Sequence, residues 1–124
     1  MVESTALQLQ SISKSYGKNS ALKSIDLTIH CGQIVALFGH NGAGKSTTLK
    51  MITGYISPTS GNVHIGDKNI IDDCIDIQKM VGYLPELNPL YAEMKVHEYL
   101  KFHASIRNIT GNKFTDALKR VVKE

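Results

Sequence analysis

Two segments near the start of the chain alternate apolar and polar residues with a period of about two. The apolar positions are Leu7, Leu9 and Ile12 in the first segment and Ile25, Leu27 and Ile29 in the second. Such alternation is typical of strands that bury one face. Residues 16–19, with the sequence Tyr-Gly-Lys-Asn, lie between the segments and have the composition of a turn. The pattern therefore predicts an N-terminal antiparallel hairpin.

The pattern changes at residues 34–38, where five apolar residues follow one another without interruption. Continuous apolar runs of this length are typical of strands that are buried on both faces of a parallel sheet. A helical pattern follows over residues 45–53, with Leu49 and Ile52 expected to face the core and Gly54 to end the helix. A buried strand followed by a helix indicates an α/β arrangement.

The remainder of the chain predicts two more strands and two amphipathic helices. Residues 57–61 have the composition of a turn, and short strands are expected at residues 62–67 and 79–84. Two groups of mostly apolar residues then recur at helical spacing: Val96, Tyr99, Leu100 and His103, and then Phe114, Ala117, Leu118, Val121 and Val122. Each group is expected to form one face of a helix.

Residues 39–46 match the phosphate-loop pattern G-x-x-x-x-G-K-[ST]. Glycines allow the backbone to wrap closely around phosphates with its N–H groups pointing inward. Lys45 supplies a cation for the β- and γ-phosphates, and the Ser46 hydroxyl can ligate Mg²⁺. A chance match is disfavoured, because an expected buried strand precedes the loop and a helix follows it. The expected phosphate-binding residues are Gly39, His40, Asn41, Gly42, Ala43, Gly44, Lys45, Ser46 and Thr47.

Composition and charge exclude some classes of protein and partner but do not indicate a function. The 124 residues are 42% hydrophobic, which suits one modest globular domain, and no apolar run is long enough for a transmembrane helix. The net charge of +3 is too small to indicate a nucleic-acid groove, so no nucleic-acid partner is expected. Cys31 and Cys74 are isolated, and no secretory signal is visible, which together favour the cytoplasm.

The loop GHNGAGKST at residues 39–47, with Tyr16 lying 23 residues before it and GYLPE beginning at Gly82, resembles the ATP-binding cassette of ABC transporters. The resemblance covers the whole chain. It implies an α/β P-loop NTPase fold of the cassette type with an N-terminal antiparallel β subdomain. Residues 1–124 would then be the N-terminal part of a single ABC ATP-binding domain, ending before the signature and Walker B motifs.

The resemblance also assigns roles to two residues outside the phosphate loop. Tyr16 matches the aromatic residue that stacks on adenine in the family, although a hairpin tyrosine can also simply pack. Glu86 stands where the family usually has a Gln that contacts Mg²⁺. A carboxylate is also a hard oxygen ligand, but it adds negative charge, and Glu86 can instead be a solvated loop acid. The resemblance thus gives Lys45 and Glu86 as catalytic residues, and Ser46 and Glu86 as metal ligands. His40 also departs from the family pattern, where Pro is commoner.

The function that the resemblance implies is the ATP-binding subunit of an ABC transporter. It would bind MgATP and, when complete and paired with a second cassette, hydrolyse it to drive export through a membrane-spanning partner at the inner face of the cell membrane. The sequence from Gly82 to Tyr91 is similar to exporter cassettes, including those associated with gliding motility. A soluble cassette ATPase of DNA repair or translation and a non-catalytic nucleotide-binding module remain alternatives. Since residues 1–124 contain no signature motif or Asp-Glu strand, we expect ATP binding with negligible turnover by this chain alone.

Overall fold

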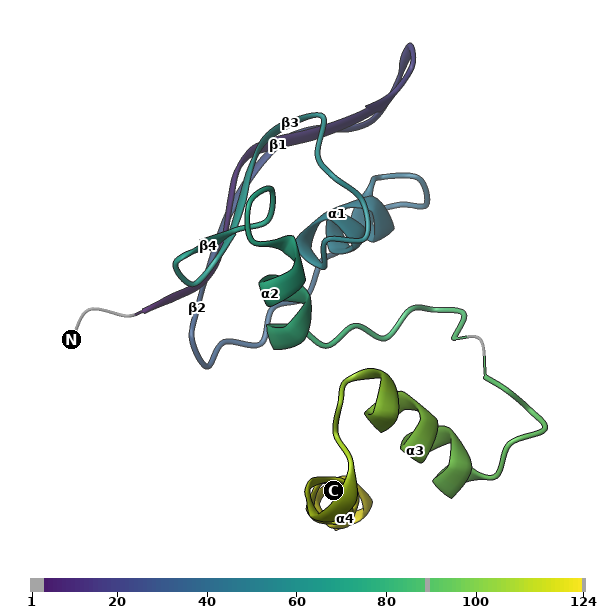
Figure 1. Cartoon of the computed structure of the whole chain (residues 1–124). Helices are drawn as coiled ribbons and strands as arrows, with labels where there is room; N and C mark the ends of the chain where they lie inside the picture. Colours follow the sequence, from purple (N-terminus) through teal and green to yellow (C-terminus); the bar gives the residue numbers. More distant parts are fainter. Residues whose placement is uncertain (1–3, 89, 124) are drawn as a thin grey trace. The chain divides into compact units, whose positions relative to one another are not determined.

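The computed structural model of the chain describes residues 4–88 and 90–123. They form two compact units that divide between Tyr83 and Leu84. The first unit contains a four-stranded sheet and two helices, and the second contains two helices (Figure 1). In chain order the elements are β1 (Thr5–Tyr16), β2 (Asn19–His30), α1 (Lys45–Ile52), β3 (Ser60–Ile65), β4 (Lys68–Asn69), α2 (Cys74–Met80), α3 (Val96–Ile106) and α4 (Gly111–Lys123).

The sheet of the first unit has the strand order β2-β1-β3-β4, and all its neighbouring strands are antiparallel. The predicted N-terminal hairpin is confirmed, because β1 pairs with β2 along its length and the turn between them contains Gly17 at a φ of 58°. Strand β1 lies in the middle, where Leu9 pairs with Leu27 on one side and with Val63 on the other. The predicted strand at residues 62–67 is also present, as β3.

A β-bulge in β1 explains how Leu9 and Ile12, which are an odd number of residues apart, both lie in the core. Leu9 and Ile12 are three residues apart, so a regular strand would place them on opposite faces. Their partners Leu27 and Ile25 are only two apart, so β1 carries one extra residue here. Within this stretch Ser11 has a φ of 48°, and its backbone N–H donates to Asp26 Oδ1 at 2.7 Å. The bulge therefore directs both Leu9 and Ile12 into the core.

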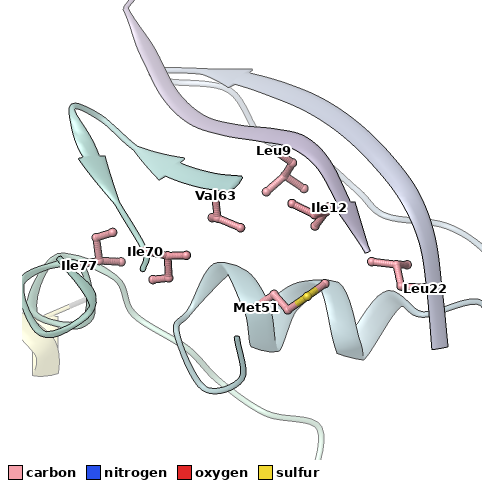
Figure 2. Packing of buried hydrophobic residues seen from close by; sticks show 7 residues of the cluster. All are labelled: Leu9, Ile12, Leu22, Met51, Val63, Ile70 and Ile77. Carbon is pink, nitrogen blue, oxygen red and sulfur yellow. The ribbon is translucent and has the colours of Figure 1, made fainter. Parts of the chain in front are cut away.

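The hydrophobic core lies between the sheet and the helices α1 and α2 (Figure 2). Its buried side chains are Leu9, Ile12, Leu22, Met51, Val63, Ile70 and Ile77. The predicted helix after the phosphate loop is confirmed as α1, and Gly54 follows it at a φ of 68°. Ile52 packs against the core as expected, but the expectation for Leu49 was wrong. Leu49 is 44% exposed because Thr48 and Met51, one helical turn apart, form the buried face of α1.

The prediction of a buried strand at residues 34–38 was wrong for this structure. The segment has no regular secondary structure, and Ile34 and Phe38 are almost fully exposed. A strand of a parallel sheet forms only when neighbouring strands accept and donate its backbone hydrogen bonds. Among the described residues, no strand pairs with this segment. The apolar pattern alone therefore did not produce a strand.

The predicted strand at residues 79–84 was also wrong. Lys79 and Met80 form the end of α2, and the residues after them have no regular secondary structure. Helix α2 buries Ile77 completely, and its C-cap Val81 donates its backbone N–H to the carbonyl of Ile77 at 3.0 Å. Residues 74–80 therefore form a helix that buries the Ile77 side chain in the core. Residues 70–73 form the turn that connects β4 to α2.

In the second unit, both predicted amphipathic helices are confirmed as α3 and α4. The Glu98 carboxylate accepts the backbone N–H of Lys95 at 3.0 Å and so satisfies one free donor at the start of α3. Aromatic contacts join the two helices, since the rings of His97 and Phe114 meet edge to face at 5.7 Å between centroids.

Candidate nucleotide-binding site

The phosphate loop connects residues 34–38 to the first turn of α1 and needs glycine at specific positions. Gly42 and Gly44 have φ values of 85° and 93°, which side chains rarely allow. A Cβ atom on Gly44 would also lie 2.6 Å from Leu22 Cδ1. Gly44 therefore allows both the turn of the loop and the close approach of the loop to β2.

The Lys45 ammonium group lies inside the loop. Its Nζ donates to the carbonyl oxygen of Gly39 at 2.6 Å and to that of His40 at 2.8 Å. The Ala43 N–H donates to the His40 carbonyl at 3.1 Å and closes the turn. The loop therefore curls around a cation that is attached to its own last turn. In this structure two carbonyl oxygens accept from the ammonium group, so the groups that can attract an anion here are the ammonium group itself and backbone N–H groups.

The N-terminus of α1 points its free N–H groups toward the loop. The N–H groups of Lys45, Ser46 and Thr47 have no acceptor within the helix, and the first turn contains no acidic residue. Thr48 makes the first helical bond, from its N–H to the Gly44 carbonyl at 2.8 Å. The positive end of the helix dipole therefore adds to the Lys45 charge. The Ser46 side chain is exposed here and offers a hydroxyl oxygen of the kind that binds Mg²⁺.

A hollow of about 350 Å³ lies between the loop and β2. It is lined by residues 20–25 of β2 and by His40, Gly42 and Ala43 of the loop. The His40 ring is held in the loop, because its Nδ1 donates to the Asn41 carbonyl at 2.8 Å. This part of β2 is a wall of the site that the sequence pattern does not predict. No motif marks it, because the wall exists only where the folded hairpin brings Leu22 of β2 close to Gly44 of the loop.

Tyr16 lies at the end of β1, in the same unit as the phosphate loop, and its side chain is 56% exposed. The Nζ of Lys14 lies over its ring, 5.2 Å from the centroid. An exposed aromatic ring at a strand end is available to stack on a flat ligand. Lys14 was not among the sequence-predicted residues, although residues two apart in a strand share a face.

Glu86 lies in an exposed segment of the second unit, while the phosphate loop belongs to the first. The Mg²⁺ contact of Glu86 therefore stays a prediction. Among the described residues, no group of three or more His, Cys, Asp or Glu side chains could hold a metal ion by itself. None of the described helices has the length and apolar character needed to cross a membrane.

Comparison with known proteins identifies the family. The family model for the ABC transporter matches residues 22–124. The human phospholipid-transporting ATPase ABCA3 is 37% identical over 103 residues, which are 83% of this chain and 6% of that protein. The uncharacterized ABC transporter ATP-binding protein YxlF of Bacillus subtilis is 32% identical over 117 residues, which are 94% of this chain and 38% of that protein. The chain thus spans much less than two thirds of either relative.

Solved structures show the same relationship at the level of the fold. The ATP-binding subunit of an ABC transporter superimposes with a TM-score of 0.74 and 31% identity, over 85% of this chain and 44% of that one. The cbiO1 protein of Clostridium perfringens, part of the ABC transporter complex cbiONQ, superimposes with a TM-score of 0.78 over 98% of this chain and 50% of that one. Its 22% identity supports the fold alone. The chain belongs to the ABC transporter family and has the α/β P-loop fold of the family's ATP-binding cassettes, with the antiparallel β subdomain at its N-terminus.

Proposed function

We propose that this chain is the nucleotide-binding part of a transporter ATPase subunit and that it binds MgATP at the phosphate loop. Residues 1–124 would form the N-terminal part of one cassette domain. One observation carries the proposal: the loop is curled around the Lys45 ammonium group at the N-terminus of a helix whose first turn contains no acid. This combination of cation, free N–H groups and helix dipole suits a polyphosphate.

The geometry supports a simple account of phosphate binding. The Gly39 and His40 carbonyls hold the Lys45 ammonium group inside the loop before the ligand arrives. The β- and γ-phosphate oxygens would replace these carbonyls as acceptors, because a charged acceptor forms a stronger hydrogen bond. The N–H groups of α1 would bind the same phosphates from the helix end. The hollow beside β2 leaves room for the rest of the nucleotide.

Other residues would complete the nucleotide site. Tyr16 would stack on the base, and such contacts are worth about 1–3 kcal/mol per base in single-strand binders. Ser46 and Glu86 would hold Mg²⁺, which neutralises charge on the phosphate oxygens when it is bound. An exposed serine hydroxyl at the first turn of α1 fits this role.

Hydrolysis and transport need parts beyond these residues. A second cassette would complete the site, and a membrane-spanning partner would use the energy for export. Two observations support a transporter rather than a soluble cassette ATPase: the names of relatives such as the phospholipid-transporting ATPase ABCA3, and the GYLPE sequence at Gly82–Glu86 that resembles exporter cassettes. Residues 1–124 contain no Asp-Glu pair after an apolar strand to position the attacking water. We therefore propose that they bind ATP with negligible turnover when they are alone.

The experiment compares two lysines of the same helix. Lys45→Ala removes the ammonium group inside the loop, while Lys50→Ala removes one from the last turn of α1. Charge-assisted hydrogen bonds predict that Lys45→Ala weakens MgATP binding by roughly ten- to a hundredfold. Lys50→Ala should leave the affinity within about twofold of the wild-type value, because the helix end away from the phosphates contributes little. Titration calorimetry with MgATP measures both.

Two outcomes would count against the proposal. Equal losses in the two variants would show that general positive charge, rather than the loop, attracts the nucleotide. Unchanged binding by Lys45→Ala would place the phosphates elsewhere. Circular dichroism of each variant confirms that α1 and the sheet are retained, so a folding defect is not mistaken for a binding defect.

A further inference from the structure

The Lys14 ammonium group has two partners at the end of the hairpin. Its Nζ donates to the Ser57 carbonyl oxygen at 2.7 Å, and it lies 5.2 Å from the centroid of the Tyr16 ring. This distance is within the range of a cation–π interaction. Lys14 therefore joins the aromatic ring of β1 to the loop between α1 and β3, which lies 43 residues further along the chain.

The loop that holds Lys14 is itself attached firmly to β1. The Thr59 N–H donates to the Ser13 carbonyl at 2.8 Å, and the Ser15 N–H donates to Thr59 Oγ1 at 3.0 Å. The hydroxyl groups of Ser13 and Ser60 lie 2.7 Å apart in a further hydrogen bond. The Ser57 carbonyl is therefore presented by a backbone that several hydrogen bonds hold in register. Lys14 is restrained at its far end, and a restrained ammonium group limits how the ring beside it can turn.

We infer that Lys14 is a positioning residue for the base of the nucleotide. It covers one face of the Tyr16 ring and holds the ring so that the other face receives the base. This inference rests on the proposed role of Tyr16 in stacking. A ring ordered before binding loses less side-chain freedom when the base stacks on it, and this raises the affinity. The effect belongs to the base alone, because Lys14 acts through Tyr16 and not on the phosphates.

The test separates the base from the phosphates. Lys14→Met removes the charged end and keeps an unbranched side chain of nearly the same length, and binding is measured with MgATP and with inorganic triphosphate. We expect ATP affinity to fall by about two- to fivefold, the effect of one exposed cation–π contact. Triphosphate affinity should not change. Lys14→Arg should restore ATP binding, since a guanidinium group also stacks on aromatic rings.

Two further variants control for charge and for the ring. Lys18→Met removes an exposed lysine from the turn of the same hairpin and should leave ATP affinity unchanged. In a Tyr16→Ala background, Lys14→Met should cause no additional loss, because the ring through which it acts is absent. Equal losses for ATP and triphosphate, or a full additional loss in the Tyr16→Ala background, would overturn the positioning role.

A measurement without nucleotide distinguishes this inference from the proposed function. In the wild-type chain, NMR should show the ε-methylene protons of Lys14 shifted upfield by the Tyr16 ring, and Tyr16→Ala should remove the shift. A normal shift in the wild type would contradict the inference even if ATP binds well. If the shift is present but Tyr16→Ala leaves ATP affinity unchanged, the stacking role of Tyr16 is wrong and the inference falls with it.

Discussion

The first unit contains two apolar segments, of which one forms a buried strand and the other is exposed without regular secondary structure. Strand β1 alternates apolar and polar residues and forms the middle of the sheet, with Leu9 and Ile12 fully buried. Residues 34–38 are apolar without interruption, yet they form no strand and expose Ile34 and Phe38. Of the two segments, the more hydrophobic one is therefore the less buried.

The difference lies in where the hydrogen-bonding partners come from. Strand β1 finds β2 after a turn at Gly17, so the hairpin forms from neighbouring residues. A parallel strand has no such local partner and needs a crossover connection to the next strand. Hydrophobicity thus favours burial, but paired backbone groups decide which segment becomes a strand.

The largest expected effect comes from the same substitution in both segments. Ile12→Ala removes a fully buried side chain, and Ile34→Ala removes a fully exposed one. Ile12→Ala should lower the free energy of unfolding by about 2–5 kcal/mol, because it leaves a cavity beneath the sheet. Ile34→Ala should change it by less than about 0.5 kcal/mol. Urea unfolding followed by circular dichroism measures both, since the chain has no Trp.

Similar losses in the two variants would break the comparison. Such a result would mean that residues 34–38 are buried in solution, by self-association or by another arrangement of the chain. Repeating the unfolding at several protein concentrations separates these cases, because only self-association makes the midpoint depend on concentration.

Local patterns predicted the hairpin, α1, α3 and α4, because each depends on residues close in sequence. The strand at residues 79–84 was wrong since a short apolar run does not distinguish a strand from a helix. Helix α2 and the bulge at Ser11 could not be predicted either. Both depend on the core, where Ile77 fills space beside the sheet and the bulge directs Ile12 inward.

The candidate site also contains features that the sequence predicts and features that depend on the folded structure. The phosphate loop was predictable because its residues are contiguous and the types Gly, Lys and Ser carry the chemistry. The contact between Lys14 and the Ser57 carbonyl was not, because it joins residues 43 positions apart through a backbone group that any residue provides. The wall that β2 contributes also depends on the folded hairpin rather than on a motif.

A smaller effect is expected from the glycines of β3 and of the turn after it. A Cβ atom on Gly61 would lie 2.4 Å from the backbone oxygens of Gln10 and Ser11, at the bulge of β1. Gly66 also has a positive φ, but nothing lies within 4 Å of its Cβ position. Gly61→Ala should therefore cost roughly 1–3 kcal/mol more free energy of unfolding than Gly66→Ala. Both variants place a side chain at a positive φ, so the difference between their thermal unfolding reports the clash at Gly61. Equal losses of stability in the two variants would mean that the bulge of β1 can relax around a side chain.

The smallest expected effect concerns the charges on α2. The hydrogen bond and charge of Lys79, followed by those of Lys68, lower the pKa of the Asp76 carboxyl group. The ammonium groups lie 3.1 Å and 3.5 Å from its oxygens. A pKa that is lower in the folded state means that ionised Asp76 stabilises the fold at neutral pH. This contribution is lost as the pH falls below about 4 and through the lowered pKa.

Asp76→Asn tests this pH dependence, with Asp72→Asn as a control in the preceding exposed loop. At about pH 7 and low ionic strength, Asp76→Asn should be slightly less stable than the wild type, and the difference should shrink as the pH falls below about 4 and vanish once the pH is below the lowered pKa of Asp76. Because Asp76 is exposed, added salt should also reduce the difference at neutral pH. A difference that persists at low pH would assign the effect to helix α2 itself rather than to its ion pairs. A decrease of the same size in Asp72→Asn would assign it to the net charge of the unit, because that variant removes one negative charge without touching the contacts of Asp76.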